Sequence, residues 1–97
     1  MIHNKENLTI KKVTIIIRNE IGFHARPCAV FARTANNFES EITVSNGQEK
    51  VNGKSILGLM TLAAVKGAKL SIEAVGFDAE GAASALSSIA ENNFEEL

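Results

Sequence analysis

The sequence predicts an α+β fold in which a four-stranded antiparallel sheet is covered on one side by three helices. Several short segments alternate apolar and polar residues, which indicates strands that bury one face. Three other segments carry apolar residues at helical spacing, and the elements follow the order β-α-β-β-α-β-α. Strands with one polar face are typical of an antiparallel sheet with helices on its other face. The length of 97 residues, 45% of them hydrophobic, predicts a single domain.

The first strand is predicted over residues 11–18, where apolar residues alternate with polar ones. The segment before it, residues 1–10, has no periodic apolar face and is predicted to be a flexible tail. The folded domain is therefore expected to span residues 11–97. The residues expected to point inward are Val13, Ile15 and Ile17.

The first helix is predicted to open with Pro27 at its first helical position, because proline lacks an N–H and has a suitable φ. A second strand over residues 41–45 and the turn dipeptide Asn46-Gly47 then indicate a hairpin. The apolar residues of this helix are Cys28, Phe31, Ala32, Ala35 and Phe38.

The second half of the chain begins with Ser55 in the position of a helix N-cap. Gly58 weakens the helix that follows, so we expect it to be short. The last strand is predicted over residues 69–74 and is ended by Gly76, and Asp78 is expected to cap the last helix. The apolar stripe of that helix is Ala79, Ala82, Ala83, Leu86, Ile89 and Ala90.

The net charge and the cysteine content indicate which partners and which cellular compartment the sequence favours. Ten basic and eleven acidic residues give a net charge of −1, which does not favour nucleic acid or a membrane surface as the partner. The single cysteine, Cys28, cannot form an internal disulfide, and the sequence lacks the tight spacing of four ligand residues that is typical of a zinc site, so no metal is predicted. The first twelve residues lack the apolar run of a signal peptide, so we expect a cytoplasmic protein.

The segment 22–27, Gly-Phe-His-Ala-Arg-Pro, carries the strongest chemical signal. It places His24 and Arg26 at the start of a helix, where unpaired N–H groups and the helix dipole can hold an anion. A neutral imidazole is nucleophilic near neutral pH, and the guanidinium can bind the same oxygens. The pattern indicates a phosphate site beside a nucleophile. The plainer alternative, that His24 only caps the helix and Arg26 is a surface charge, has similar weight on spacing alone.

The second segment of interest, residues 51–55, resembles a Walker A loop only superficially, because the spacing of its glycines is wrong and the chain is too short. Ser55 is interpreted as a helix N-cap, and its hydroxyl could also be phosphorylated. The helix after Ser55 is more apolar than one buried face requires, which indicates either a docking surface or a wholly buried helix. Cys28 is interpreted as a small buried residue. The less favoured alternative is a reactive thiolate at the helix N-terminus.

These two segments together resemble the HPr family, the histidine-containing phosphocarriers of the phosphoenolpyruvate-dependent phosphotransferase system. Residues 22–27 are similar to the active-site signature of the family, and residues 54–60, Lys-Ser-Ile-Leu-Gly-Leu-Met, are similar to its regulatory-serine segment. The resemblance covers roughly residues 11–91 and implies an open-faced β-sandwich. It also implies a phosphoryl carrier that is not itself an enzyme, with no cofactor.

The resemblance assigns roles to individual residues. It implies that enzyme I phosphorylates His24 on Nδ1, that Arg26 and the backbone N–H groups of Ala25 and Arg26 hold the phosphoryl group, and that an enzyme IIA protein or domain receives it. It implies that a serine kinase or phosphorylase acts on Ser55. The docking face that it implies for the partners consists of Phe23, Ile56, Leu57 and Met60. We expect the carrier to be a monomer.

Two alternatives remain open from the sequence. Ile21 stands where many sugar-system members have a small polar residue, so a nitrogen-type regulatory phosphocarrier is one alternative. The other is a small regulatory domain in which His24 and Arg26 bind a metabolite anion reversibly.

Overall fold

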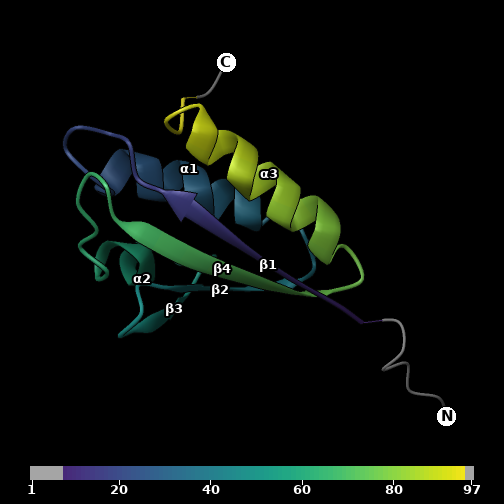
Figure 1. The fold of residues 1–97 in the computed structure, drawn as a ribbon. Coiled ribbons are helices and arrows are strands. Elements are labelled where there is room, and N and C mark those ends of the chain that lie inside the picture. The colour runs from purple at the N-terminus through teal and green to yellow at the C-terminus, as the bar shows by residue number, and fades with distance from the viewer. Residues whose placement is uncertain (1–7, 96–97) are drawn as a thin grey trace, which may run out of the picture.

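Strands and helices follow one another in the predicted order β-α-β-β-α-β-α (Figure 1). The structure is a computed structural model that describes residues 8–95. The predicted α+β fold is confirmed. The elements are β1 (Thr9–Ile16), α1 (Ala25–Ala35), β2 (Glu41–Ser45), β3 (Lys50–Asn52), α2 (Ile56–Met60), β4 (Lys69–Gly76) and α3 (Ala79–Glu91).

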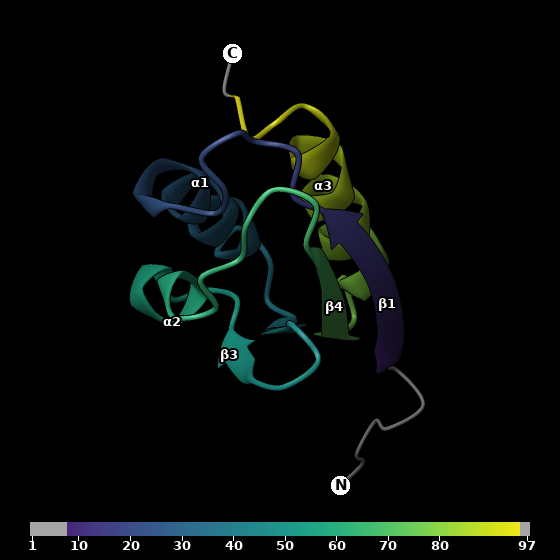
Figure 2. The same ribbon diagram turned by 60° about the vertical axis from the view of Figure 1, so that its left-hand side comes forward.

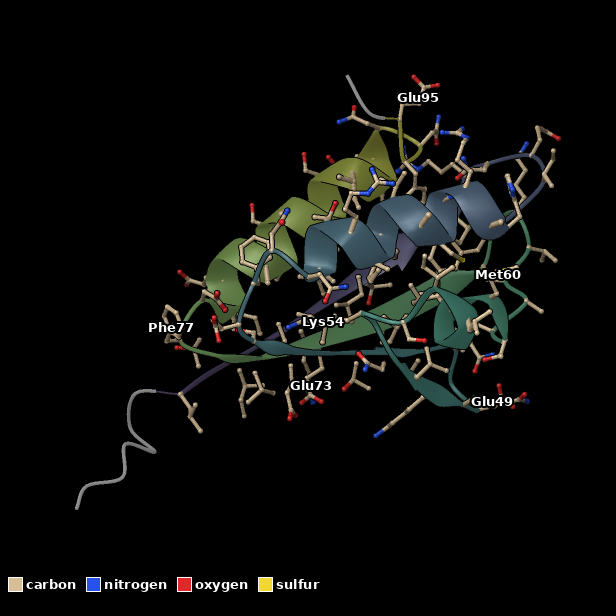
Figure 3. The ribbon with its side chains drawn as sticks, turned by 180° about the vertical axis from the view of Figure 1, so that it is seen from behind. Glu49, Lys54, Met60, Glu73, Phe77 and Glu95 are labelled. Atoms are coloured by element: carbon tan, nitrogen blue, oxygen red, sulfur yellow. The ribbon has the colours of Figure 1, made fainter. Side chains whose placement is uncertain are left out.

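The four strands form one antiparallel sheet in the order β1-β4-β2-β3. The register pairs Ile15 of β1 with Leu70 of β4 and Val44 of β2 with Ile72 of β4, so buried residues lie side by side. The helices cover one face of the sheet and leave the other face open (Figures 1 and 2). Figure 3 shows Glu73 of β4 pointing to the open side, away from the helices.

The core lies between the sheet and the helices, and the period-two and helical patterns of the sequence account for most of it. Burial of this apolar surface supplies the main stabilisation of the fold. The largest fully buried apolar side chains are Phe31, Phe94, Ile17, Leu59, Leu70, Ile72 and Leu86.

The first strand begins earlier than predicted. β1 starts at Thr9, which pairs with Gly76, and Ile10 pairs with Val75. The prediction that the flexible tail reaches residue 10 is therefore wrong at its last two residues, because the far end of β4 offers them partners. Residues 1–7 of the predicted tail lie outside the described residues.

The N-terminus of α3 also differs from the prediction. Asp78 is the N-cap residue, but its side chain makes no capping hydrogen bond. Its carboxylate instead accepts from the backbone N–H of Glu39 at 2.9 Å, from the N–H of Ser40 at 3.0 Å and from the Ser40 hydroxyl. These hydrogen bonds lower the pKa of Asp78, and the bond from the Ser40 hydroxyl makes the largest contribution. The carboxylate thus ties the start of β2 to the β4–α3 turn.

Candidate functional site

His24 is the N-cap residue of α1, and its side chain makes no capping hydrogen bond. Its backbone is extended, with φ −101° and ψ −165°, and its own N–H donates to the carbonyl of Gly22 at 3.1 Å. The ring is half-buried. The alternative in which the side chain of His24 acts only as a helix cap is therefore wrong, and the ring is available for other chemistry.

Two backbone N–H groups in the first turn of α1, directly after His24 in the chain, are unpaired within residues 8–95. Among the described residues, the N–H groups of Ala25 and Arg26 make no hydrogen bond, whereas Cys28 already donates to the carbonyl of His24 at 3.0 Å. Pro27 is the third helical residue and not the first as predicted, because α1 begins at Ala25. Proline is tolerated there since the N–H that it lacks would also be unpaired. The site therefore offers two backbone donors and the exposed Arg26 guanidinium.

The loop before His24 is held against the segment that follows α2. Phe23 donates its backbone N–H to the carbonyl of Ala64 at 2.9 Å. Gly22 has φ +90°, and a Cβ at this position would lie 2.7 Å from the Ala64 carbonyl oxygen. Only glycine fits both the left-handed backbone and this close approach. This contact fixes the position from which the chain enters α1.

Phe23 anchors the same loop in the core. Its side chain is only 4% exposed and packs against Phe31 and Phe94, with ring centroids 6.0 Å and 5.5 Å apart. The prediction that Phe23 belongs to an exposed docking face is therefore wrong for its side chain. Burial between α1 and the C-terminal turn gives Phe23 a positioning role one residue before His24.

Cys28 is fully buried in the first turn of α1. Desolvation by burial raises the pKa of its thiol to about 11, so the thiol stays protonated at neutral pH. This agrees with the interpretation of Cys28 as a small buried residue and opposes thiolate formation.

Ser55 is the N-cap residue of α2, as predicted. Its Oγ accepts a hydrogen bond from the backbone N–H of Gly58 at 2.9 Å. The preceding residue is also fixed, because Lys54 Nζ donates to the carbonyl of Phe38 at 2.6 Å and Asn36 donates to the carbonyl of Lys54 at 3.1 Å. The start of α2 is thereby attached to the end of α1, its neighbour in Figures 1 and 2.

The outer side of α2 is apolar and exposed. The exposed fractions are 42% for Ile56, 77% for Leu57 and 40% for Met60, whereas Leu59 is fully buried. The alternative of a wholly buried α2 is therefore wrong. We call Ile56, Leu57 and Met60 the α2 face.

Two further exposed apolar residues lie beside the His24 loop, and the sequence did not predict their exposure. Ile21 is 78% exposed and Val65 is 67% exposed, and the backbone of Val65 lies against Gly22. Lys66 and Glu20 form an ion pair next to them. Single apolar residues in charged loops carry no periodic signal, so the sequence alone could not separate them from ordinary loop residues.

Within residues 8–95, no group of three or more histidine, cysteine, aspartate or glutamate side chains is arranged to hold a metal ion. In the same range, no helix is both long and apolar enough to cross a membrane.

The comparison with protein families decides the family of the chain. A sequence model described as the HPr component phosphorylation site of the phosphotransferase system matches residues 11–92. This chain belongs to the HPr family. By family it is a phosphocarrier protein of the phosphotransferase system and not a catalytic enzyme.

Individual HPr proteins agree in sequence and fold. The phosphocarrier protein HPr of Neisseria meningitidis serogroup A is 44% identical over 85 residues, which are 88% of this chain and 96% of that protein. HPr of Treponema pallidum is 39% identical over 83 residues, 86% of this chain and 94% of that protein. The crystal structure of HPr from Thermoanaerobacter tengcongensis has a TM-score of 0.83 and 46% identity, and the match covers 90% of this chain and 99% of that chain. The expected open-faced β-sandwich is thus confirmed.

Proposed function

We propose that this chain accepts a phosphoryl group on His24 from phosphorylated enzyme I and transfers it to enzyme IIA of the sugar phosphotransferase system. The observation that carries the proposal is the start of α1, where the ring of His24 makes no capping bond and the N–H groups of the next two residues are unpaired among the described residues. Membership of a phosphocarrier family supports the same chemistry.

In the proposed transfer, the lone pair on Nδ1 of neutral His24 attacks the phosphorus carried by enzyme I. The new N–P bond forms while the bond to the donor breaks, and Nε2 keeps its proton. The N–H groups of Ala25 and Arg26 and the Arg26 guanidinium stabilise the charge on the phosphoryl oxygens. Transfer to enzyme IIA uses the same groups in the reverse sense.

The α2 face is proposed as the common docking surface for enzyme I and enzyme IIA. Apolar side chains that remain exposed next to a reactive site favour association with another protein. We further propose that a serine kinase or phosphorylase modifies Ser55. A phosphate there would add about −1.5 to −2 charges beside the α2 face and oppose its desolvation by a partner.

The cellular setting follows from these partners. Phosphorylated enzyme I and enzyme IIA would meet the carrier in the cytoplasm, and the net charge of −1 gives no reason to add a nucleic-acid or membrane partner.

The proposal is tested by following radiolabelled phosphate from phosphoenolpyruvate through enzyme I to this chain and then to enzyme IIA. We expect the label on the chain to appear only with enzyme I and to leave when enzyme IIA is added. A chain that stays unlabelled, while an HPr of known activity is labelled in a parallel reaction, would contradict the proposal. Binding of free phosphate without covalent label would favour the anion-binding alternative.

A further inference from the structure

The loop that leads from β1 into α1 is held at both ends by one other segment, the C-terminal turn at residues 92–95. At the start of the loop, Asn19 Nδ2 donates to the carbonyl of Asn93 at 3.1 Å, across 74 positions of sequence. At its end, the ring of Phe23 packs against the ring of Phe94, with centroids 5.5 Å apart. Figure 2 shows this turn beside the chain between β1 and α1. Two consecutive residues of the turn therefore contact the two ends of the loop.

The C-terminal turn makes these contacts with a strained backbone. Asn93 has φ +57° and Phe94 has φ +59°, in the left-handed region that favours glycine. The N–H of Phe94 closes the turn by donating to the carbonyl of Ile89 at 2.7 Å, and the Phe94 side chain is fully buried. A glycine at residue 94 would end α3 without strain but would remove one of the rings that pack against Phe23. Strain of this kind is concentrated at functional sites.

The side chain of Asn19 is a second feature that the stability of the fold does not explain. Its Oδ1 is buried and accepts no hydrogen bond from a described residue. A buried acceptor without a donor lowers stability by at least as much as one ordinary hydrogen bond raises it, so the amide of Asn19 gives little net gain. The carbonyl of Asn19 accepts from the N–H of Gly22 at 3.0 Å and closes the tight turn before Phe23. The side chain therefore fixes where this turn lies rather than stabilising the fold.

The other contacts of the loop do not replace this attachment. The N–H of Phe23 bonds to the carbonyl of Ala64, which fixes the end of the loop. Near the start of the loop, Glu20 pairs with Lys66, but both side chains are exposed and such ion pairs stabilise weakly. The buried attachment at the start of the loop is therefore the bond from Asn19 to the C-terminal turn.

We propose that Asn19 and Phe94 are positioning residues for His24, which hold the loop so that Nδ1 is aligned with the phosphorus that it attacks. The inference rests on the proposed function, because it concerns the same phosphoryl transfer. Phe94 is fully buried and Asn19 is half-buried, so neither adds to the α2 face. A displacement of about 1 Å at a reacting group can slow a reaction about a hundredfold. Loosening the attachment should therefore lower the rate of transfer and leave the affinity for enzyme I unchanged.

Asn19→Ala and Asn92→Ala are a matched pair of variants that test the proposal by rapid-quench transfer from phosphorylated enzyme I. Asn92 lies in the same turn, but it is exposed and its side chain makes no hydrogen bond with a described residue. In Asn19→Ala the rate at saturating carrier should fall about tenfold with an unchanged KM. Its melting temperature should stay within about 3 °C of the parent, because the unpaired Oδ1 is lost together with the bond. Asn92→Ala should match the parent in rate, KM and melting temperature.

Phe94→Leu tests the other contact of the C-terminal turn. Leucine keeps an apolar side chain at this position but loses the ring that packs against Phe23. The rate of transfer should fall about tenfold, again with an unchanged KM, and the protein should melt below the parent temperature. A folded Phe94→Leu protein that transfers at the parent rate would overturn the role of Phe94.

Hydrogen exchange reads the loop without enzyme I. The amide of Gly22 should exchange about tenfold faster in Asn19→Ala, while the amide of Phe31 in the core keeps its rate. Unchanged exchange at Gly22 would overturn the proposed attachment. A melting temperature that falls by more than about 10 °C in Asn19→Ala would make the side chain structural and would also overturn the proposal.

The transfer measurements separate this inference from the proposed function. A parent chain that takes no phosphoryl group from enzyme I would overturn the proposed function, and the positioning role with it. A parent chain that is phosphorylated, with an Asn19→Ala variant that transfers at the parent rate, would overturn the positioning role alone. An equal loss of rate in Asn92→Ala would do the same, because the effect would then not depend on the contact with the loop.

Discussion

The N-termini of α1 and α2 use their N-cap side chains in opposite ways. At α2 the Ser55 hydroxyl accepts from the N–H of Gly58, so the cap is occupied by the fold itself. At α1 the ring of His24 makes no such bond, and the N–H groups of Ala25 and Arg26 stay unpaired among the described residues. The difference separates a helix start that stabilises the fold from one that is free to bind an anion.

The free end of α1 is stabilised from outside the helix. Phe23 is buried between two other phenylalanine rings, and its N–H bonds to Ala64 in the segment after α2. These contacts hold the loop before α1 in place although His24 makes no capping bond. The structure can therefore present the ring of His24 without loosening the loop that carries it.

The largest effect is expected for His24→Ala. If His24 is the acceptor, this variant should lose all detectable phosphorylation by enzyme I, while the fold is retained because the ring makes no capping bond. Transfer of radiolabel measures the phosphorylation, and circular dichroism measures whether the fold is retained. Full labelling of a folded His24→Ala protein would show that another residue is the acceptor.

A smaller kinetic loss is expected for Arg26→Ala. Two backbone donors remain in this variant, so transfer should slow about tenfold to a hundredfold without stopping. Arg26→Lys is the matched control that keeps the charge but loses the bidentate geometry. Its transfer rate should lie between the rates of the parent protein and of Arg26→Ala. Rapid-quench measurements with enzyme I give the rates. Identical rates for all three proteins would make Arg26 a surface charge only.

The capped helix start is probed by Ser55→Asp. Aspartate is also a good N-cap, so the variant should melt close to the parent temperature. The new charge next to Ile56, Leu57 and Met60 should weaken association with enzyme I about tenfold, seen as a higher apparent KM. Ser55→Ala is the uncharged control and should lose about 1 kcal/mol of stability but keep the parent KM. Equal KM values for Ser55→Asp and parent would leave Ser55 as a cap alone.

A substitution of Asp78, at the start of the third helix α3, should change the stability of the fold and leave phosphorylation unchanged. The folded-state pKa of Asp78 is lowered, so its stabilising contribution is present above the unfolded pKa and is lost as the pH falls through the folded pKa. Asp78→Asn should therefore melt below the parent near pH 7, and the gap should shrink toward about pH 3. Phosphorylation of His24 should not change. A gap that stays constant with pH would mean that the ionised carboxylate is not the stabilising form.

Local patterns predicted the elements well where neighbours in sequence decide the structure. The strand at residues 41–45 has the predicted bounds, and Ser55 caps α2 as its position indicated. The position of His24, Ala25 and Arg26 at one helix start was predicted in the same way, because the three residues are consecutive, whereas their role in holding a phosphoryl group stays a prediction.

The missed features depend on contacts between distant segments. Phe23 is buried because it packs against Phe94 in the C-terminal turn. The carboxylate of Asp78 accepts a hydrogen bond from the N–H of Ser40 and makes no capping bond in α3. Thr9 joins β1 because Gly76 lies opposite. No periodicity within one segment contains these partners, so propensity and spacing could not show them.

The most direct test of the account compares the two helix starts in one measurement. After incubation with enzyme I and phosphoenolpyruvate, intact-mass spectrometry before and after mild acid distinguishes phosphohistidine, which acid hydrolyses, from phosphoserine, which survives. We predict one phosphoryl group that acid removes, and that disappears in His24→Ala but is unchanged in Ser55→Ala. An acid-stable phosphoryl group, or one that is lost in Ser55→Ala and kept in His24→Ala, would contradict the account.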